Sequence, residues 1–354
     1  MFGQMQQAFG LDLSDRTIRL AKCKKIGKKI ILTSYNESAV PNDIVINGEI
    51  QQPDKLIKLI QQLIKTAAGQ KIKTKNVISV LPETKTFIKV LTLPNQINKK
   101  NLEETPKLIE KEIINHIPLA PEEIYFDWQL LEQGSDWSSV LVGATPKNLV
   151  DSYYSVLQNC GLTPYVLEIE AAAIVRSLLS EKEKGAKIII DFGAMRTGLI
   201  IFDKNTIQFT VSLPISGNKI TEAIAKTLKL DEKKAEKAKL VCGLDREKCE
   251  GAMLKVLMGS INNLAEQIKK AIIFYKTNFV SGNEISEIII CGGGANFLKI
   301  DEVLKEMLNL PVKIGNPLNN LSLDKKISLS KNKILSYTSA IGLALRSLQK
   351  EKFI

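Results

Sequence analysis

Apolar residues along this chain follow two periods, which predict an alternation of strands and helices. Short apolar runs at 9–13 and 188–192 each read as a buried strand. Apolar residues three and four positions apart predict helices that begin at Pro53 and that span about 252–279 and 336–349. Further strands are expected at 26–33, 76–80, 87–94, 138–145, 199–202, 206–212, 287–291 and 311–314, and the segment 117–131 is expected to turn through two prolines into a strand. Further helices are expected at 99–115, 147–158, 168–180, 218–229, 231–240 and 297–308.

The two halves of the chain repeat one pattern. Residues 9–19 (F-G-L-D-L-S-D-R-T-I-R) and 188–198 (I-I-I-D-F-G-A-M-R-T-G) each hold an apolar strand, a terminal aspartate, a turn with a threonine, and more apolar chain. Helices and a second buried strand follow in both halves. An internal duplication explains this repetition. The strand-helix-strand-strand-helix pattern from about 86 to 159 is then an inserted α+β unit.

Length and charge limit the class of protein. With 354 residues the chain is long enough for two domains, and 44% hydrophobic and 25% charged residues are typical of a globular protein. The formal net charge is +11, but the lysines are spread along the chain and seldom alternate with aromatic residues. This distribution favours a solvated surface that faces an acidic partner or an anionic membrane over nucleic acid.

Cysteine and histidine usage excludes several kinds of site. Five cysteines at scattered spacings, with no C-x-x-C pair, indicate reduced thiols rather than a disulfide framework or a zinc site. The one histidine, His116, precedes Ile117-Pro118 at an expected helix end, which argues against a Ser-His-Asp or Cys-His active site. No apolar run is long enough to span a membrane, and the chain lacks a signal-peptide pattern.

The first aspartate turn is a candidate phosphate site. Ser14 and Thr17 carry hydroxyls that can donate to phosphate, and Asp12 can order a hydrated Mg²⁺. Ser14 stands where glycine would let the backbone approach an anion most closely. The alternative is that Asp12 caps an ordinary β-turn.

The second aspartate turn keeps its glycine. Asp191 follows three isoleucines, so its carboxylate is expected at the open end of a buried strand, where α/β sheets place ligands. Gly193 permits a close backbone approach to an anion. Arg196 either contacts phosphate or points to solvent.

Two further motifs point to a nucleotide. Gly292-Gly293-Gly294 lies between an apolar strand and a helix, where three glycines let the chain pass flat against a purine or approach phosphate. A plain strand-to-helix turn would need only one glycine. Glu236 and Lys239 share one face of a lysine-rich helix; a solvated helix face is the simpler interpretation, and a pair that brackets a ribose is the other.

The order of these motifs resembles the actin-like ATPase superfamily. D-L-S-D-R-T, an inserted unit, D-F-G-A-M-R-T, A-E-K-A-K and C-G-G-G-A occur in the superfamily's sequence of phosphate-1, phosphate-2 and adenosine motifs. Within it, the chain is most similar to the PilM family of type IV pilus assembly proteins, relatives of the cell-division protein FtsA. This closer resemblance covers nearly the whole chain, and its most distinctive stretch is I-P-L-A-P-E-E-I-Y-F-D-W-Q-L-L at 117–131.

The resemblance implies an α/β, actin-like (ribonuclease H-like), duplicated two-lobed fold with an inserted α+β subdomain, called 1C. Lobe 1 is expected at 1–85 plus 160–185 with part of the last helix, subdomain 1C at 86–159, and lobe 2 at 186–354 with its 2B part at about 213–280. The resemblance also implies ATP or ADP with Mg²⁺ in a cleft between the lobes. The implied nucleotide contacts are Asp12, Ser14, Asp15, Arg16 and Thr17 on one side, Asp191, Gly193, Ala194 and Thr197 on the other, Glu236 and Lys239 at the ribose, and Gly292, Gly293, Gly294 and Ala295 along the adenine.

The family role implied is a scaffold. It binds the N-terminal cytoplasmic tail of the inner-membrane protein PilN in a groove of subdomains 1A and 1C, and contacts the pilus motor ATPases. Self-association and peripheral association with the inner membrane through the partner belong to the same expectation, which places the chain in the cytoplasm. Nucleic acid is not an expected partner.

Departures from the family pattern bear on catalysis. The first loop of the family commonly reads D-I-G-x-x-[ST]-x-K, whereas this chain has Ser14 and Arg19 at the glycine and lysine positions. Met195 and Arg196 replace small residues in the second loop. Bulk beside a γ-phosphate favours ADP, slows hydrolysis or weakens binding. If hydrolysis occurs, Asp12 and Asp191 are the predicted catalytic residues, positioning Mg²⁺ and the attacking water.

Two other functions remain as alternatives. An ATP-dependent sugar kinase of the same superfamily needs an aspartate base beside the γ-phosphate, and no convincing candidate occurs between the expected lobes. An FtsA-like membrane tether needs an amphipathic anchor, whereas the sequence stops directly after the last expected helix.

Overall fold

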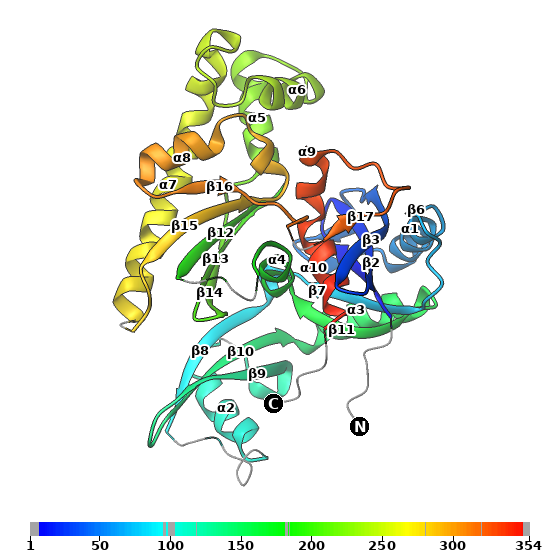
Figure 1. The fold of residues 1–354 in the computed structure, drawn as a ribbon, viewed down its shortest axis with the longest axis vertical. Helices are drawn as coiled ribbons and strands as arrows, with labels where there is room; N and C mark the ends of the chain where they lie inside the picture. Colours follow the sequence, from blue (N-terminus) through cyan, green and yellow to red (C-terminus); the bar gives the residue numbers. More distant parts are fainter. Residues whose placement is uncertain are drawn as a thin grey trace.

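The computed structural model describes residues 7–94, 97, 103–117, 119–180, 183, 185–279, 281–319 and 321–349. These residues form two α/β lobes and a smaller three-stranded unit beside them (Figure 1). Most of the expected linker at 181–185 and both ends of the chain lie outside the described residues. No helix in the described ranges is both long and apolar enough to cross a membrane.

The first lobe is built on a seven-stranded sheet. Its strands follow the order β11-β7-β1-β2-β3-β17, with β6 paired to β3. A meander of β1, β2 and β3 is antiparallel, whereas β7 and β11 are parallel to β1 and to each other. The strand bounds are β1 Phe9–Leu13, β2 Thr17–Ile26, β3 Lys29–Ala39, β6 Ala68–Gly69, β7 Asn76–Leu81, β11 Thr163–Ile169 and β17 Ser322–Leu323, with a small β4 (Val45–Ile46) and β5 (Glu49–Ile50) hairpin outside the sheet.

The second lobe repeats this topology. Its five-stranded sheet has the order β14-β13-β12-β15-β16, again an antiparallel meander followed by two parallel strands. The strand bounds are β12 Ala186–Phe192, β13 Thr197–Asp203, β14 Thr206–Leu213, β15 Ile285–Cys291 and β16 Val312–Ile314. Because both meanders and both parallel pairs occur in the same order, the expected internal duplication is confirmed.

Helices cover both faces of each sheet. The first sheet packs against α1 (Pro53–Lys65) and α3 (Lys147–Asn159) on one face, and against α10 (Thr338–Arg346) on the other. The second sheet packs against α5 (Gly217–Leu228), α7 (Ala252–Asn278) and α8 (Ile300–Leu308) on one face, and against α4 (Glu170–Leu178) on the other. The helices α4 and α10 contact each other where the two lobes meet (Figure 1). Two further helices are α6 (Glu232–Cys242) and α9 (Lys331–Ile334).

The inserted unit is a sheet with one helix on its face. Its strands β8 (Phe87–Leu93), β10 (Ser138–Pro146) and β9 (Ile124–Gln133) are antiparallel, and α2 (Thr105–Ile113) packs against them around Ile109. The helix α3, which the sequence assigned to this unit, contributes Tyr153 and its other buried side chains to the core of the first lobe.

Several sequence-based boundaries differ from the structure; among them, the strand expected at 26–33 spans Lys29–Ala39 and the helix expected at 336–349 spans Thr338–Arg346. The helix expected at 168–180 begins only at Glu170, because residues 163–169 form β11 beside β7. The helix expected at 99–115 spans Thr105–Ile113, and Leu102, one of its expected apolar positions, lies outside the described residues. The helix expected at 297–308 begins at Ile300, after a 3₁₀ turn over the glycine-rich segment.

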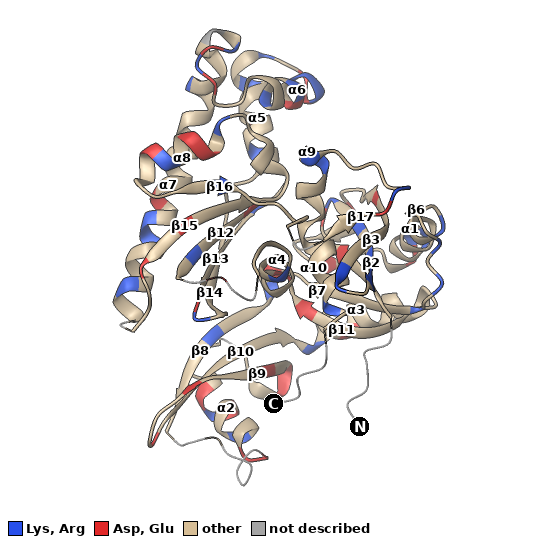
Figure 2. Cartoon of the chain, in the orientation of Figure 1, with Lys and Arg blue, Asp and Glu red and all other residues tan. Residues whose placement is uncertain are grey.

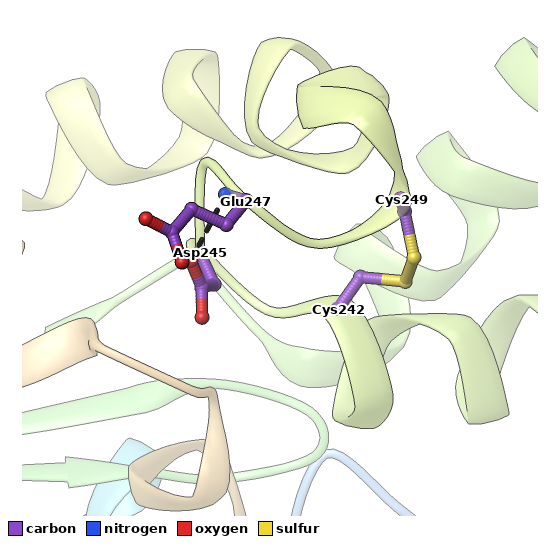
Figure 3. Close-up of a disulfide and its surroundings, with 4 residues drawn as sticks. All are labelled: Cys242, Asp245, Glu247 and Cys249. Atoms are coloured by element: carbon purple, nitrogen blue, oxygen red, sulfur yellow. Dashed lines mark hydrogen bonds between the residues drawn. A yellow bond between two sulfur atoms is a disulfide. The ribbon is translucent and has the colours of Figure 1, made fainter.

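The cysteine prediction is wrong for one pair. Cys242, the last residue of α6, and Cys249 form a disulfide across the loop that leads to α7 (Figure 3). Spacing did not reveal this pair because the loop folds back on itself and brings the two Cα atoms to 5.9 Å. Within this loop, Asp245 accepts a hydrogen bond from the backbone N–H of Glu247. The other cysteines (Cys23, Cys160 and Cys291) are free.

Candidate functional site

The two predicted aspartates occupy equivalent places in the two lobes. Asp12 lies one residue before the end of β1, and Asp191 one residue before the end of β12. Each of these strands is the one from which its sheet passes from the antiparallel meander to the parallel pair. Across the hairpin, Asp12 pairs with Arg19 and Asp191 pairs with Gly198. The duplication therefore presents two carboxylates at the same end of two similar sheets.

Four carboxylates interact at the junction of the lobes: Asp12, Glu83, Glu170 and Asp191, the interlobe carboxylate cluster. Burial and the charge of Glu170 raise the pKa of Asp12 from 3.8 to about 8, and that of Asp191 to about 7. The same two causes raise the pKa of Glu83 to about 8. Burial also raises the pKa of Glu170, although Ser339 donates a hydrogen bond of 3.0 Å to its carboxylate. Burial and mutual repulsion thus favour the protonated forms of these carboxyl groups, unless a cation is bound beside them.

Two arginines are the cations that act on this cluster. Arg19 lies on β2, and Arg196 lies on the loop between β12 and β13, the second aspartate loop. The charges of both lower the pKa values of Glu170 and Asp191. Each guanidinium also has another partner. Arg19 Nε lies 3.4 Å from Glu37 Oε2, and Arg196 Nη2 lies 3.3 Å from Thr84 Oγ1 in the first lobe. Arg196 therefore points across to the first lobe while remaining partly exposed.

The two aspartate loops have the same backbone turn. The N–H of Ser14 donates to the carbonyl oxygen of Thr17 at 3.0 Å, and the N–H of Gly193 donates to that of Arg196 at 3.0 Å. Between these positions, four N–H groups donate no hydrogen bond to any described residue. They belong to Asp15, Arg16, Ala194 and Met195. Unpaired N–H groups in a tight turn form a concave anion-binding surface.

The register shows that the two threonines are not equivalent. Thr17 occupies the place of Arg196, and Thr197 the place of Ile18. The Thr17 hydroxyl lies 3.2 Å from the hydroxyl of Ser14 within the loop. The Thr197 side chain is fully buried and donates to the carbonyl oxygen of Ile215 at 2.8 Å. The Thr197 hydroxyl therefore stabilises the hairpin.

Asp15 also has a structural partner. Its two carboxylate oxygens accept hydrogen bonds from the backbone N–H groups of Asn47 (3.0 Å) and Gly48 (2.9 Å). Both partners have positive φ angles in the turn between β4 and β5. The Asp15 carboxylate thus holds this turn against the first loop. Only the backbone N–H of Asp15 remains to bind an anion.

The three glycines of the triplet have different surroundings. A Cβ atom on Gly292 would overlap the carboxylate of Asp191, and one on Gly294 would overlap the ring of Phe192. These two glycines let the segment pack against the second loop. Gly293 is exposed, and a Cβ atom there would meet nothing within 4 Å. Packing within the described residues gives no reason for a glycine at 293.

Glu236 and Lys239 form one polar group with the start of α5. The Lys239 side chain is only 4% exposed and donates to the hydroxyl of Thr221 (2.7 Å) and the carbonyl oxygen of Gly217 (3.1 Å). The Glu236 carboxylate is paired with Lys239 and accepts from Thr221 at 2.6 Å, but its side chain is 47% exposed. The solvated-face interpretation is therefore wrong for Lys239. A Cβ atom on Gly217 would lie within 4 Å of both Ala194 and Lys239, so this group lies behind the second loop.

Two other predicted residues have fewer polar contacts. Arg16 is partly buried, and its carbonyl oxygen accepts the N–H of Val40. Ala295 is 5% exposed and packs in the core of the second lobe.

Sequence reasoning missed Glu83 and Glu170. Glu83 follows Pro82 just beyond the end of β7, and Glu170 follows β11 as the first residue of α4. Both lie past the carboxyl end of a strand in the first sheet, the same signal that singled out Asp12 and Asp191. Glu83 Oε1 is buried without a hydrogen-bond partner. The strand expected at 76–80 could have pointed to Glu83, whereas Glu170 lay inside the helix expected at 168–180, which concealed the strand before it.

Metal ligation was also predicted, through water, at Asp12 and Asp191. In the described part of the chain, no group of three or more His, Cys, Asp or Glu side chains converges closely enough to hold a metal ion directly. A water-mediated Mg²⁺ at these two carboxylates stays a prediction.

The duplicated sheet order and the paired aspartate loops define the class: the chain has the actin-like ATPase fold. Solved structures of this class agree. The structure titled "PilM-PilN type IV pilus biogenesis complex" superposes with a TM-score of 0.83 at 21% identity, covering 98% of this chain and 99% of that one. MreB5 of Spiroplasma citri bound to ADP superposes with a TM-score of 0.54 at 14% identity, covering 97% and 96%.

The family follows from the sequence. The model of the family "Type IV pilus assembly protein PilM" matches residues 10–348, and the chain belongs to this family. The chain is also similar to the cell division protein FtsA of Pseudomonas aeruginosa, 26% identical over 217 residues. That match covers 55% of this chain and 50% of FtsA, so the chain spans about half the length of this relative.

Proposed function

We propose that this protein is a nucleotide-binding scaffold of type IV pilus assembly that binds ATP or ADP between its two lobes. One observation carries the nucleotide proposal. The equivalent aspartates of the two repeats, Asp12 and Asp191, belong to one buried carboxylate cluster, in which the neighbouring arginines do not offset the rise in pKa. A ligand that brings a divalent cation and phosphates would supply the missing positive charge and would use the unpaired N–H groups of both loops.

The residues fit such a ligand in distinct ways. The unpaired N–H groups of the two loops would bind phosphate oxygens, and Arg19 and Arg196 lie close enough to the cluster to add positive charge. Gly293, open on its Cβ side, would let an adenine lie flat, and Glu236 offers an exposed carboxylate for a ribose. Bound Mg²⁺ would neutralise the carboxylates and the phosphates together. The MreB5 structure bound to ADP supports a nucleotide in this fold.

Turnover is expected to be slow. Met195 and Arg196 place long side chains in the second loop, and the Met195 sulfur accepts a hydrogen bond from Asn218 at 3.5 Å, which holds it at the loop. Ser14 fills the position of a glycine in the first loop. In the proposed site, these side chains would crowd a γ-phosphate and an attacking water. If hydrolysis occurs, Asp12 and Asp191 would orient the water and the metal ion.

The partner proposed is the N-terminal cytoplasmic tail of the inner-membrane protein PilN. The family membership and the TM-score of 0.83 to a PilM-PilN complex support this partner. The tail would lie in a groove between the first lobe and the inserted unit, in which case the chain would be recruited to the inner face of the membrane through PilN. The division into lobe 1 (1–85 and 160–185), subdomain 1C (86–159) and lobe 2 (186–354) belongs to the same proposal.

Titration calorimetry with Mg-ADP and Mg-ATP on the full chain tests the nucleotide proposal. Asp191→Asn is isosteric, so we expect it to lower nucleotide affinity at least about tenfold, because one counter-charge of the metal is lost. The same variant removes repulsion within the cluster, so the nucleotide-free protein should unfold at a higher temperature than wild type. The control Glu306→Gln changes an exposed carboxylate on α8. Unchanged affinity in Asp191→Asn would show that the site is assigned wrongly.

Capture of the full chain on an immobilised PilN tail, with and without nucleotide, tests the scaffold role. Binding to the tail, and none to a peptide of the same composition in scrambled order, is the expected result. Failure to bind under either condition would rule out the scaffold, whatever the calorimetry shows.

A further inference from the structure

Seven lysines gather on one side of the first lobe, around the hairpin of β2 and β3. We call this surface the lysine face; it comprises Lys22, Lys24, Lys25, Lys28, Lys29, Lys71 and Lys73. The segment that follows β6 lies beside the hairpin, because the N–H of Gln70 donates to the carbonyl oxygen of Thr33 at 2.8 Å. Ile72 is buried and anchors this segment, so that Lys71 and Lys73 on either side of it are exposed. Figure 2 shows the basic residues of β2.

The positive charge of the lysine face is not balanced by the protein. None of its seven ammonium groups lies within 4.0 Å of a carboxylate in the described residues, although twelve other basic side chains do. Burial lowers the pKa of Lys22, and the charges of Lys24 and Lys73 lower it further. One carboxylate, Asp324, borders this surface and accepts a hydrogen bond from Gln70. The fold thus holds several like charges together without compensating them.

An open pocket lies within the lysine face. Lys22, Lys24, Lys71 and Lys73 line its volume of about 470 Å³. The remaining lining residues are two glutamines and two threonines, so every side chain in the lining can donate a hydrogen bond. Such a lining fits an anion that also carries hydroxyl groups, such as the headgroup of an acidic phospholipid.

The tip of the hairpin adds an apolar side chain. Ile26 is 55% exposed and stands between Lys25 and Gly27-Lys28, where Gly27 has a φ of +59° that the tight turn requires. An apolar side chain flanked by lysines matches the boundary between headgroups and acyl chains. Residues 22–34 of the hairpin and the segment 70–75 contain no aromatic residue, whereas single-stranded nucleic acids are bound by aromatic stacking.

We propose that the lysine face docks directly on an anionic lipid bilayer, with acidic headgroups at the lysines and Ile26 at the acyl boundary. This contact goes beyond recruitment through a membrane-protein tail and does not depend on nucleotide. Charge complementarity to acidic lipids carries it, and each lysine near such a surface adds to the attraction. Because the charges are exposed, the attraction should weaken as salt shortens the screening length.

Flotation of the full chain with lipid vesicles tests this proposal. We expect binding to vesicles with about 30% phosphatidylglycerol, none to pure phosphatidylcholine, and release between about 50 mM and about 0.5 M salt. Charge reversal at four exposed positions should weaken binding at least about tenfold. The variant carries Lys24→Glu, Lys25→Glu, Lys71→Glu and Lys73→Glu.

A matched control carries the same change of charge elsewhere. It places glutamates at four exposed positions of α7 in the second lobe, namely Lys255, Lys269, Lys270 and Lys276. Circular dichroism and thermal unfolding confirm that both variants fold. Full binding by the control supports the lysine face, whereas an equal loss in both variants would show a general charge effect and overturn the proposal. Absence of wild-type binding to acidic vesicles at low salt also overturns it.

Ile26→Ser separates a bilayer from a soluble polyanion. Its net charge is unchanged, so we expect vesicle binding about threefold weaker and no change in any binding to a DNA duplex of about 20 base pairs. Tighter binding to the duplex than to acidic vesicles, with Ile26→Ser equal to wild type on vesicles, would identify the surface as a nucleic-acid site instead.

Discussion

Gly342 on α10 packs directly against Ala173 on α4, and a Cβ atom on Gly342 would overlap the carbonyl oxygen of Ala173. This close approach brings together α4, which leads from the first lobe to the second, and α10, which returns to the first lobe. It also lets the hydroxyl of Ser339 on α10 donate a hydrogen bond of 3.0 Å to Glu170 on α4, one of the four members of the interlobe carboxylate cluster. The carbonyl oxygen of Gly342 in turn accepts from Arg176, which is paired with Glu168.

Gly342→Ala should therefore destabilise the protein by about 3 kcal/mol, because the two helices must move apart to admit a methyl group. Chemical denaturation of the nucleotide-free protein measures this change. The control is Gly259→Ala in the middle of α7, where a Cβ atom meets nothing within 4 Å. There the higher helix propensity of alanine should leave stability unchanged or raise it by about 0.5 kcal/mol. Equal stability of the two variants would contradict the packing of α4 on α10.

The glycine triplet gives a second prediction, in which stability and binding separate. Gly293→Ala should leave the unfolding temperature unchanged, because space is open at this position. If an adenine lies along the triplet, the added methyl group should lower ADP affinity about tenfold. Gly294→Ala should instead lower stability by about 2 kcal/mol through its clash with Phe192. Calorimetry and thermal unfolding on both variants provide the two readouts.

A loss of stability in Gly293→Ala would mean that all three glycines serve packing. Unchanged ADP affinity in a fully stable Gly293→Ala would place the base elsewhere.

The elements that could be predicted from the sequence are those with a clear apolar period. The helix α1 matches its prediction because Pro53 and the spacing from Leu56 mark its start and face, and β7 is predicted to within one residue. Helix and strand were confused at 168–169, where alternating and helical patterns overlap and only the pairing of β11 with β7 decides. The internal duplication was predicted from the repeated aspartate motif together with the helices and the second buried strand that follow it in both halves.

The candidate site was only partly predictable, because partners distant in sequence decide what each side chain does. The motif identified Asp12 and Asp191, but Thr197 is a hairpin residue since its hydroxyl donates to Ile215. The Asp15 carboxylate accepts hydrogen bonds from a turn more than thirty residues further along the chain. Spacing also gave no sign of Cys242–Cys249, because the intervening loop determines whether two cysteines meet.

The disulfide gives a third prediction. Closing the short loop between Cys242 and Cys249 removes conformational freedom from the unfolded chain, so Cys249→Ser should lower stability by about 2 kcal/mol. Reduction of the wild type should have the same effect, and should have none on the variant. Cys160→Ser serves as a control, because Cys160 is free. Alkylation under non-reducing conditions, read by mass spectrometry, should leave Cys242 and Cys249 unmodified; their full modification would show that the bond is absent.

The fourth prediction concerns Asp203, at the end of β13, whose carboxylate is buried. It accepts hydrogen bonds from the hydroxyl of Tyr275 at 2.6 Å and from the side-chain amide of Asn283 at 2.7 Å. Burial alone would raise the pKa of Asp203, but the hydrogen bonds from Asn283 and Tyr275 outweigh it and hold the pKa below 3.8. Tyr275→Phe should lower stability by about 2 kcal/mol at neutral pH, because a bond to a charged acceptor is lost.

The pH dependence of this effect has a definite sign. A carboxylate whose folded pKa is depressed contributes stability above its unfolded pKa of 3.8, and loses it as the pH falls through the folded value. The difference between wild type and Tyr275→Phe should therefore be constant above about pH 5 and shrink below about pH 4. Urea denaturation across this range measures it, with Tyr154→Phe, an exposed tyrosine, as the control. A difference that stays constant down to about pH 3 would mean that Tyr275 acts through packing and not through the charge of Asp203.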